Sequence, residues 1–194
     1  MNSHFFAMMA RMKYIERWAL MRNSDAENLS EHSLEVGMIA HALAVISNVR
    51  LGSRLDVGKA ALIGMYHDAT EIITGDLPTP IKYFNADIKS AYKEIEGVAA
   101  DKLLALIPED MRGYYEPVFK KNKEDEYIRK LVKAADKISA LIKCIEEEKT
   151  GNREFASAKE STEKALDAMN LKEVDIFREE FLGSYYMTLD ELQG

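Results

Sequence analysis

The sequence YHDATEIITGDLPTP, residues 66–80, places a histidine and two carboxylates within about one helical turn. In a helix His67 and Glu71 are four residues apart, and Asp68 and Glu71 three, so all three side chains can face one cleft. Gly75 is expected to end this helix, and the two prolines after it predict a stiff, non-helical segment. A hydrolytic metal site needs these groups. The same pattern also fits an ordinary helix end with solvated charges.

The length and composition narrow the class of protein to which this chain can belong. A chain of 194 residues fits one domain, residues 1–194, and 47% hydrophobic with 30% charged residues is typical of a globular fold. The net charge of −7 argues against a nucleic-acid-binding surface, because phosphate binding needs clustered lysines and arginines. Cys144 is the only cysteine, so no intrachain disulfide can form and a cytoplasmic location is expected. Charges from Arg11 onward interrupt the apolar start too early for a signal peptide or membrane span.

Apolar residues recur at helical spacing along the chain, and no segment of any length alternates as a strand would. An all-α fold is therefore predicted. Residues 113–126 mix aromatic and charged side chains, and 120–126 are expected to be a solvated connection. The expected helices cover residues 3–19, then from a cap at Asn28 or Ser30 to a turn at 51–54, and then 56–73, 88–107, 124–149, 154–168 and 174–182.

The histidines of the second helix point in opposite directions. His32 lies in line with Val36 and Ile39, so it is expected on the buried face. A lone histidine on an apolar face is usually a hydrogen-bonded core residue. His41 is nine residues further on, which places it on the outer side at about 100° per residue. His41, and His4 near the start, are therefore not expected to be ligands.

Two aspartates interrupt apolar helical patterns. Asp136 lies among small and apolar neighbours in the longest predicted helix, and Asp68 lies in line with Met65 and Ile72. Burying an unpaired carboxylate is costly, so a partner cation is expected at each. A divalent metal held jointly by both aspartates, His32 and His67 would meet this need, if the fold brings the helices together.

The side chains on the expected inner face of the helix 88–107 are Ile95, Val98, Ala99, Leu103 and Leu106.

This order of residues resembles the H…HD…D signature of the HD-domain metal-dependent phosphohydrolases. Here the first H is His32, the HD is His67-Asp68 and the last D is Asp136. The similarity extends to the bacterial 5′-deoxynucleotidases over nearly the full length. It is carried by the segments 17-RWALMR-22, 27-ENLSEHSL-34 and 65–84.

The resemblance implies an all-α HD-domain helical bundle and a cytoplasmic homodimer. It implies hydrolysis of deoxyribonucleoside 5′-monophosphates to deoxyribonucleoside and phosphate, with a divalent transition metal such as Co, Mn, Cu or Zn. No nucleic acid or membrane partner is implied. By resemblance Glu71 would be the acid/base residue. The metal ligands would be His32, His67, Asp68 and Asp136. The substrate contacts would be Arg17, Trp18, Asp68, Asp76, Leu77, Pro78, Thr79 and Asp136.

The residue chemistry is consistent with that activity. Phosphate monoesters hydrolyse extremely slowly in water, so strong charge stabilisation is required, and a metal supplies it. Glu71 can orient a water or relay its proton. Arg17 offers a planar fork suited to phosphate oxygens. Trp18 could equally be a core residue.

Two alternatives remain open at the level of sequence. Another HD-type phosphohydrolase could act on nucleoside triphosphates, cyclic nucleotides or guanosine polyphosphates. A triphosphate would call for more cations than Arg17 and Arg22. A helical binding protein with a vestigial HD site should have lost a ligand or Glu71, and the sequence keeps all of them.

Overall fold

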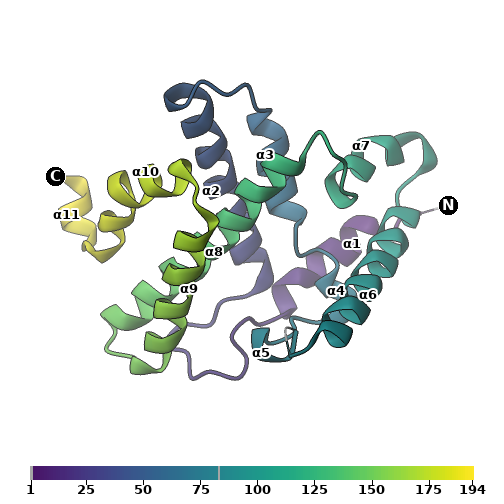
Figure 1. Ribbon diagram of the computed structural model, residues 1–194. Helices are drawn as coiled ribbons and strands as arrows, with labels where there is room; N and C mark the ends of the chain where they lie inside the picture. Colours follow the sequence, from purple (N-terminus) through teal and green to yellow (C-terminus); the bar gives the residue numbers. More distant parts are fainter. Residues whose placement is uncertain (1, 83) are drawn as a thin grey trace.

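Three helices form the centre of the molecule. The computed structural model describes residues 2–82 and 84–194, with the side chains of Thr79 and Pro80 outside that description. Helices α2 (Leu29–Arg50), α3 (Val57–Tyr66) and α8 (Glu126–Lys149) meet in the middle of Figure 1. Within the described residues there is no strand, only an isolated antiparallel bridge between Glu16 and Asn28. The all-α prediction is confirmed.

The remaining elements flank this centre on two sides. On the right of Figure 1 lie α1 (Phe5–Met9), η1 (Ala10–Tyr14), α4 (Glu71–Thr74), α5 (Thr79–Lys82), α6 (Ala86–Ala105) and α7 (Glu109–Phe119). On the left lie η2 (Arg153–Phe155), α9 (Ala156–Met169), α10 (Lys172–Glu180), η3 (Leu182–Tyr186) and α11 (Leu189–Gln193).

Two apolar clusters hold these parts together. The larger one joins α2, α3, α8 and α10, and the smaller one joins α1, η1, the start of α2 and α6. Tyr66 and Phe119 pack against both clusters. Each fully buried large apolar side chain, such as Leu43 or Leu141, contributes about 1.5–3 kcal/mol. The end of α3, where Tyr66 lies, is therefore fixed from two directions.

The start of α2 is capped as the sequence predicts. The side chain of Asn28 accepts hydrogen bonds from the backbone N–H groups of Ser30 and Glu31, and the Glu31 carboxylate accepts from Asn28 N–H. This capping box fixes the first turn of α2, on which His32 lies. Gly75 ends α4 with a φ of 73°, which also confirms the prediction.

Helices α2 and α3 touch backbone to backbone at two glycines. A Cβ placed on Gly64 would lie 2.8 Å from the Cα of Gly37 and 3.0 Å from the carbonyl oxygen of Val36. No side chain larger than hydrogen fits at Gly64 without moving a helix. This contact brings the first half of α2 against the end of α3.

The N-terminal helix is shorter than predicted. It ends at Tyr14, because Ile15 is extended and Glu16 pairs with Asn28 across an antiparallel bridge. Trp18 has a left-handed backbone with a φ of 57°. The predicted helix over 3–19 is therefore wrong beyond Tyr14, and Arg17 and Trp18 lie in a loop that runs along the bottom of Figure 1.

The predicted helix over 56–73 is interrupted. Helix α3 ends at Tyr66, residues 67–70 form a turn, and α4 follows. The inward residues of α3 are Ala60, Ile63 and Gly64, whereas Met65 is 42% exposed. The proline segment also differs from the prediction, because it contains the short helix α5.

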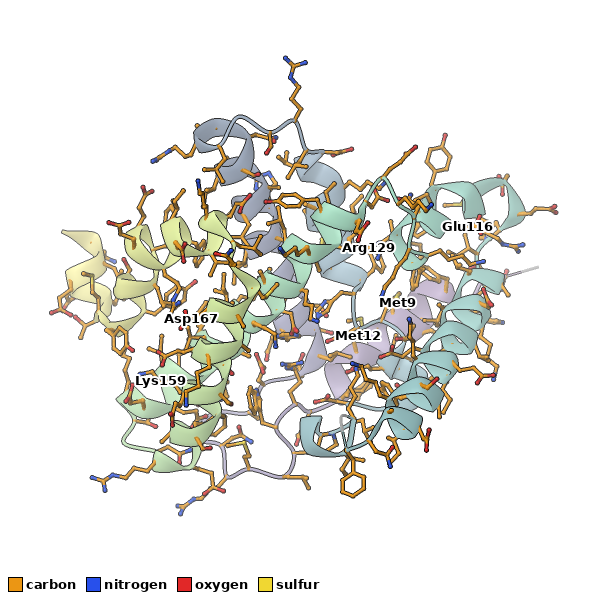
Figure 2. All side chains as sticks on the ribbon, in the orientation of Figure 1. Met9, Met12, Glu116, Arg129, Lys159 and Asp167 are labelled. Carbon is orange, nitrogen blue, oxygen red and sulfur yellow. The ribbon has the colours of Figure 1, made fainter. Side chains whose placement is uncertain are left out.

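Helix α7 lies where the sequence suggested mixed, irregular chain. Its last turn contains Pro117, and its carbonyl groups find a partner in Arg129. The Nη2 of Arg129 donates to the carbonyl oxygens of Pro117, Val118 and Lys120. Figure 2 labels Arg129 near the start of α8, close to α7.

On α6, Ile95 and Val98 are exposed at 52% and 50%, so the predicted inner face was wrong for these two.

Replacing Gly64 by alanine tests the contact between α2 and α3. We expect the added methyl group to lower the free energy of unfolding by about 1–3 kcal/mol, because it overlaps the backbone of α2. Gly97→Ala on α6 is the matched control, since nothing lies within 4 Å of its Cβ position. It should stabilise by about 0.5–1 kcal/mol. Urea unfolding measures both, and an unchanged stability in Gly64→Ala would contradict the close contact.

Candidate active site

Four side chains from three segments converge between the central helices. His32 lies on the first turn of α2, His67 and Asp68 on the turn after α3, and Asp136 in the middle of α8. One ligand atom from each lies within 4.8 Å of the others. The Nε2 of His32 is 3.2 Å from Asp136 Oδ1, and the Nε2 of His67 is 3.0 Å from Asp68 Oδ2. The structure brings together all four residues that the sequence selected.

Both histidines present a free ring nitrogen to the carboxylates. The Nε2 atoms of His32 and His67 are buried and have no hydrogen-bond partner. The other nitrogen of His67, Nδ1, donates to the carbonyl oxygen of Gly64 at 2.7 Å. His32 Nδ1 lies 3.0 Å from the hydroxyl of Ser139, which gives its own proton to Glu35 and so accepts from the imidazole. Both rings therefore direct their Nε2 atoms into the cluster.

This donor set fits a divalent cation. Two imidazole nitrogens and two carboxylates suit several transition metals, and fixing Nδ1 by a hydrogen bond is how proteins orient a histidine ligand. Burial alone would lower the pKa of His67, but Asp68 and Asp136 together hold it well above its ordinary value. A proton thus occupies the place of a cation when none is bound, and a metal would release it.

Glu71 lies at the edge of this cluster, on the first turn of α4. Its side chain is buried, and its Oε2 has no hydrogen-bond partner. Burial, followed by the charges of Asp68 and Asp76, raises the pKa of Glu71 to about 9, although Lys82 and Arg17 act in the opposite direction. Without a bound cation this carboxyl holds a proton at neutral pH. Its position and proton affinity suit an acid/base residue.

Lys82 is the cation nearest to Glu71 that sequence reasoning missed. Its Nζ is 3.8 Å from Glu71 Oε1, 3.0 Å from Glu96 Oε1 and 4.5 Å from the ring centre of Tyr92. Burial would lower the pKa of Lys82, but Glu96 and Glu71 raise it above its ordinary value. Lys82 is therefore a permanent positive charge beside Glu71.

Arg17 reaches the cluster from the loop before α2, and Trp18 follows it in the same loop. Arg17 Nη1 lies 3.7 Å from Asp68 Oδ2, so the guanidinium stands beside the cluster, where its planar fork suits a phosphate group. The Trp18 ring packs on Phe155 with their centroids 5.2 Å apart. Trp18 is thus partly buried without belonging to either apolar cluster.

The segment between α4 and α5 carries the other predicted substrate contacts. Asp76, Leu77 and Pro78 are partly buried. Burial is the main cause that raises the pKa of Asp76. Arg17 lowers this pKa and Asp68 raises it, which shows that the Asp76 carboxyl lies close enough to the cluster to interact with its charges. The structure shows no hydrogen bond from the side chains of these described residues. The side chain of Thr79 lies outside the described part of the chain.

A buried ion pair on α8 anchors the loop that holds Arg17 and Trp18. Glu147 accepts hydrogen bonds from the backbone N–H of Ser24, at 2.9 and 3.0 Å, and from Lys143 Nζ at 2.5 Å. Lys143 also donates to the carbonyl oxygen of Asp25. Both side chains are at most 5% exposed. A charged pair at i,i+4 inside an apolar helical pattern was the sequence signal for this anchor.

Ser139 and Glu35 were also missed at the level of sequence. Each lies one turn after a proposed ligand, Ser139 three residues beyond Asp136 and Glu35 three residues beyond His32. Polar residues at that spacing from a histidine or aspartate on a buried face could have indicated the hydrogen bonds that orient the ligands.

Comparison with known proteins agrees with this geometry. The family model described as 5′-deoxynucleotidase YfbR-like matches residues 4–185. The chain is 48% identical to the 5′-deoxynucleotidase YfbR of Shigella flexneri over 191 residues, which cover 98% of this chain and 96% of that protein. It is equally similar, with the same coverage, to a 5′-deoxynucleotidase of Erwinia tasmaniensis. No helix in the described residues is long and apolar enough to cross a membrane.

Solved structures share the fold at lower identity. An HD-domain phosphohydrolase from Listeria innocua superposes with a TM-score of 0.81 at 20% identity, covering 100% of this chain and 93% of that one. The cyanophage S-2L HD phosphohydrolase, bound to dA and one catalytic Zn2+ ion, superposes with a TM-score of 0.65 at 20% identity, covering 94% and 96%. The match across nearly the whole length shows that the chain belongs to the YfbR-like 5′-deoxynucleotidase family, and it shares the fold of HD-domain phosphohydrolases.

Proposed function

We propose that this protein hydrolyses deoxyribonucleoside 5′-monophosphates at the cluster of His32, His67, Asp68 and Asp136. The observation that carries the assignment is the pair of buried Nε2 atoms, both without partners, that face two carboxylates. Relatives at 48% identity are 5′-deoxynucleotidases, which supports the substrate class. Residues 1–194 would form one catalytic domain.

The four cluster residues would hold one divalent transition metal, such as Co, Mn, Cu or Zn. When bound, such an ion stabilises negative charge on the phosphoryl group and makes a water more acidic. The Zn2+ ion of the cyanophage enzyme supports this choice of cofactor. Asp68 and Asp136 would in addition border the bound substrate.

Two residues of the chain have separate roles in the hydrolysis of the phosphate ester. Water's oxygen bonds to phosphorus and gives up a proton, the bond from phosphorus to the 5′-oxygen breaks, and the leaving 5′-oxygen takes up a proton. Glu71 is the residue we assign to proton transfer, because its carboxyl is buried, has a pKa of about 9 and keeps Oε2 unpaired. Arg17 would bind the phosphoryl oxygens through its Nη atoms.

The sugar would be held between Trp18 and the loop after Gly75. Asp76 could accept a hydrogen bond from the 3′-hydroxyl, and Leu77, Pro78 and Thr79 would line the same side. An apolar wall alone discriminates against an added hydroxyl by only about 10²-fold, so a steric limit must contribute to sharper selectivity. Trp18 supplies such a limit next to Arg17.

The triphosphate alternative is weaker in this site. Among the described residues, Arg17 and Lys82 are the cations that perturb Glu71, and Lys82 is already paired with Glu96. A triphosphate would bring more negative charge than these groups can balance.

We further propose a cytoplasmic homodimer. Leu34 and Met38 on α2, with Leu62 and Met65 on α3, are large apolar side chains that stay exposed on adjacent helices. Such a surface is suited to burial against a second copy. The net charge of −7 disfavours nucleic acid as the partner.

Replacing His67 by alanine tests the link between metal and activity. We expect His67→Ala to lose both bound metal and phosphate release while its circular dichroism keeps the helical signal. His41→Ala is the matched control, because His41 is exposed on α2 away from the cluster. Substrates should include deoxy- and ribonucleoside monophosphates, triphosphates and cyclic nucleotides, with and without added metals. Normal turnover by metal-free His67→Ala, or preferred release from a triphosphate, would contradict the proposal.

Replacing Glu71 by glutamine separates catalysis from metal binding. Glutamine keeps the shape but cannot exchange the proton, so kcat should fall by roughly 10²–10⁴ with the metal still bound. Metal content by elemental analysis and steady-state kinetics measure the two effects. Loss of the metal in Glu71→Gln would make Glu71 a ligand and overturn its assigned role.

Replacing Trp18 by alanine tests the origin of sugar selectivity. We expect the ratio of kcat/KM for a deoxynucleotide to that for the matching ribonucleotide to fall, mainly because the deoxy substrate loses packing. Trp18→Phe keeps a ring and should retain more of the ratio. Several bases should be hydrolysed at similar rates in the wild type. If Trp18→Ala leaves the deoxy-to-ribo ratio unchanged, Trp18 has no part in selectivity.

A further inference from the structure

We infer that Glu27, which is not among the candidate site residues named above, is the positioning residue that aims Arg17 and Trp18 at the substrate. The inference rests on the proposed function for its kinetic consequences. The contacts that support it are visible in the protein alone. Glu27 ends the loop that begins after η1, one residue before the cap of α2.

A single oxygen of Glu27 holds both side chains. Its Oε2 accepts a hydrogen bond from Arg17 Nε at 3.0 Å and another from Trp18 Nε1 at 2.9 Å. The backbone reinforces the pairing, because Arg17 N–H donates to the carbonyl oxygen of Glu27 at 2.9 Å. The side chains of Glu27 and Arg17 are 13% and 11% exposed, so water screens this ion pair little.

For Arg17 the contact fixes the direction of the guanidinium plane. Occupying Nε leaves the two Nη groups to face the cluster, where Nη1 lies 3.7 Å from Asp68 Oδ2. Glu27 is the carboxylate that acts most strongly on Arg17, ahead of Asp136 and Asp68. Without Glu27 the Nε group would lose its hydrogen-bond partner, and the plane of the guanidinium would no longer be fixed.

For Trp18 the contact holds an unusual backbone. A φ of 57° is uncommon for a bulky L residue and needs support from the surroundings. The indole N–H is held by Glu27, and the ring packs on Phe155. These two contacts keep the indole in one orientation beside Arg17.

Glu27 does not bind the metal in this arrangement. Its Oε1 is 3.9 Å from Nδ1 of His32, which is beyond hydrogen-bond distance, and that nitrogen is already engaged with Ser139. Changing Glu27 should therefore alter substrate binding and leave the metal in place.

The experiment uses Trp18 as its own reporter, because it is the only tryptophan in the chain. Glu27→Ala and the isosteric Glu27→Gln are compared with Glu16→Ala. Glu16 lies in the same loop, is exposed and shows no side-chain hydrogen bond among the described residues. Emission maximum, anisotropy and acrylamide quenching are measured on the free protein, and metal content and kinetics on the loaded one.

In Glu27→Ala we expect red-shifted Trp18 emission, lower anisotropy and stronger quenching than in Glu16→Ala. The value of kcat/KM for a deoxynucleotide should fall about ten-fold to a hundred-fold, mostly through KM, with one metal per chain retained. The deoxy-to-ribo ratio should fall with it. Glu27→Gln should show smaller changes in the same direction, because an amide oxygen still accepts from the indole.

A double-mutant test separates positioning from general stability. In a background with both Arg17→Ala and Trp18→Ala, Glu27→Ala should lower kcat/KM less than two-fold further, because its targets are gone. An undiminished effect there, or Trp18 fluorescence in Glu27→Ala equal to that in Glu16→Ala, would overturn the inference. Should the wild type release no phosphate from deoxynucleotides, the proposed function fails, and the fluorescence comparison still decides whether Glu27 positions Trp18.

Discussion

The structure depends on two buried imidazole nitrogens, the Nε2 atoms of His32 and His67, which face the carboxylates of Asp136 and Asp68 but make no hydrogen bond. Leaving a buried polar atom unpaired costs about 1–3 kcal/mol, and burying unpaired carboxylates costs more. The fold nevertheless directs His32 and His67 to the same point, through the capping box of α2 and the contact at Gly37 and Gly64. A cation at that point satisfies all four groups, which explains why the chain keeps this otherwise unfavourable arrangement.

Acidic side chains outnumber basic side chains around the cluster. Five carboxylates interact electrostatically with Arg17 or with one another: Glu27, Asp68, Glu71, Asp76 and Asp136. The nearby cation Lys82 already forms an ion pair with Glu96. An anionic substrate could not enter such a site without additional positive charge. Burial is the main cause of the raised pKa of Glu71, and the nearby carboxylates of Asp68 and Asp76 raise it further. The same carboxylates that require a cation therefore also help to keep a proton on Glu71.

The sequence predicted the helical class, most helix ranges and the four cluster residues, because helical periodicity and an ordered H…HD…D pattern are local signals. It failed where distant partners decide the outcome. The helix predicted through Trp18 stops at Tyr14 because Glu16 pairs with Asn28, and the outward position of Ile95 depends on which face of α6 meets the core. Ser139, Lys82 and Glu27 became visible only when the fold placed them beside their partners.

In the proposed site one divalent ion is held by His32, His67, Asp68 and Asp136, and both histidines bind it through Nε2. The most direct test is a crystal structure of the protein grown with Zn2+ or Co2+, with anomalous diffraction collected at the absorption edge of that metal. We expect a single anomalous peak about 2.0–2.1 Å from both Nε2 atoms, with Glu71 outside the ligand set. A peak at another site, ligation through Nδ1, or direct coordination by Glu71 would contradict this assignment.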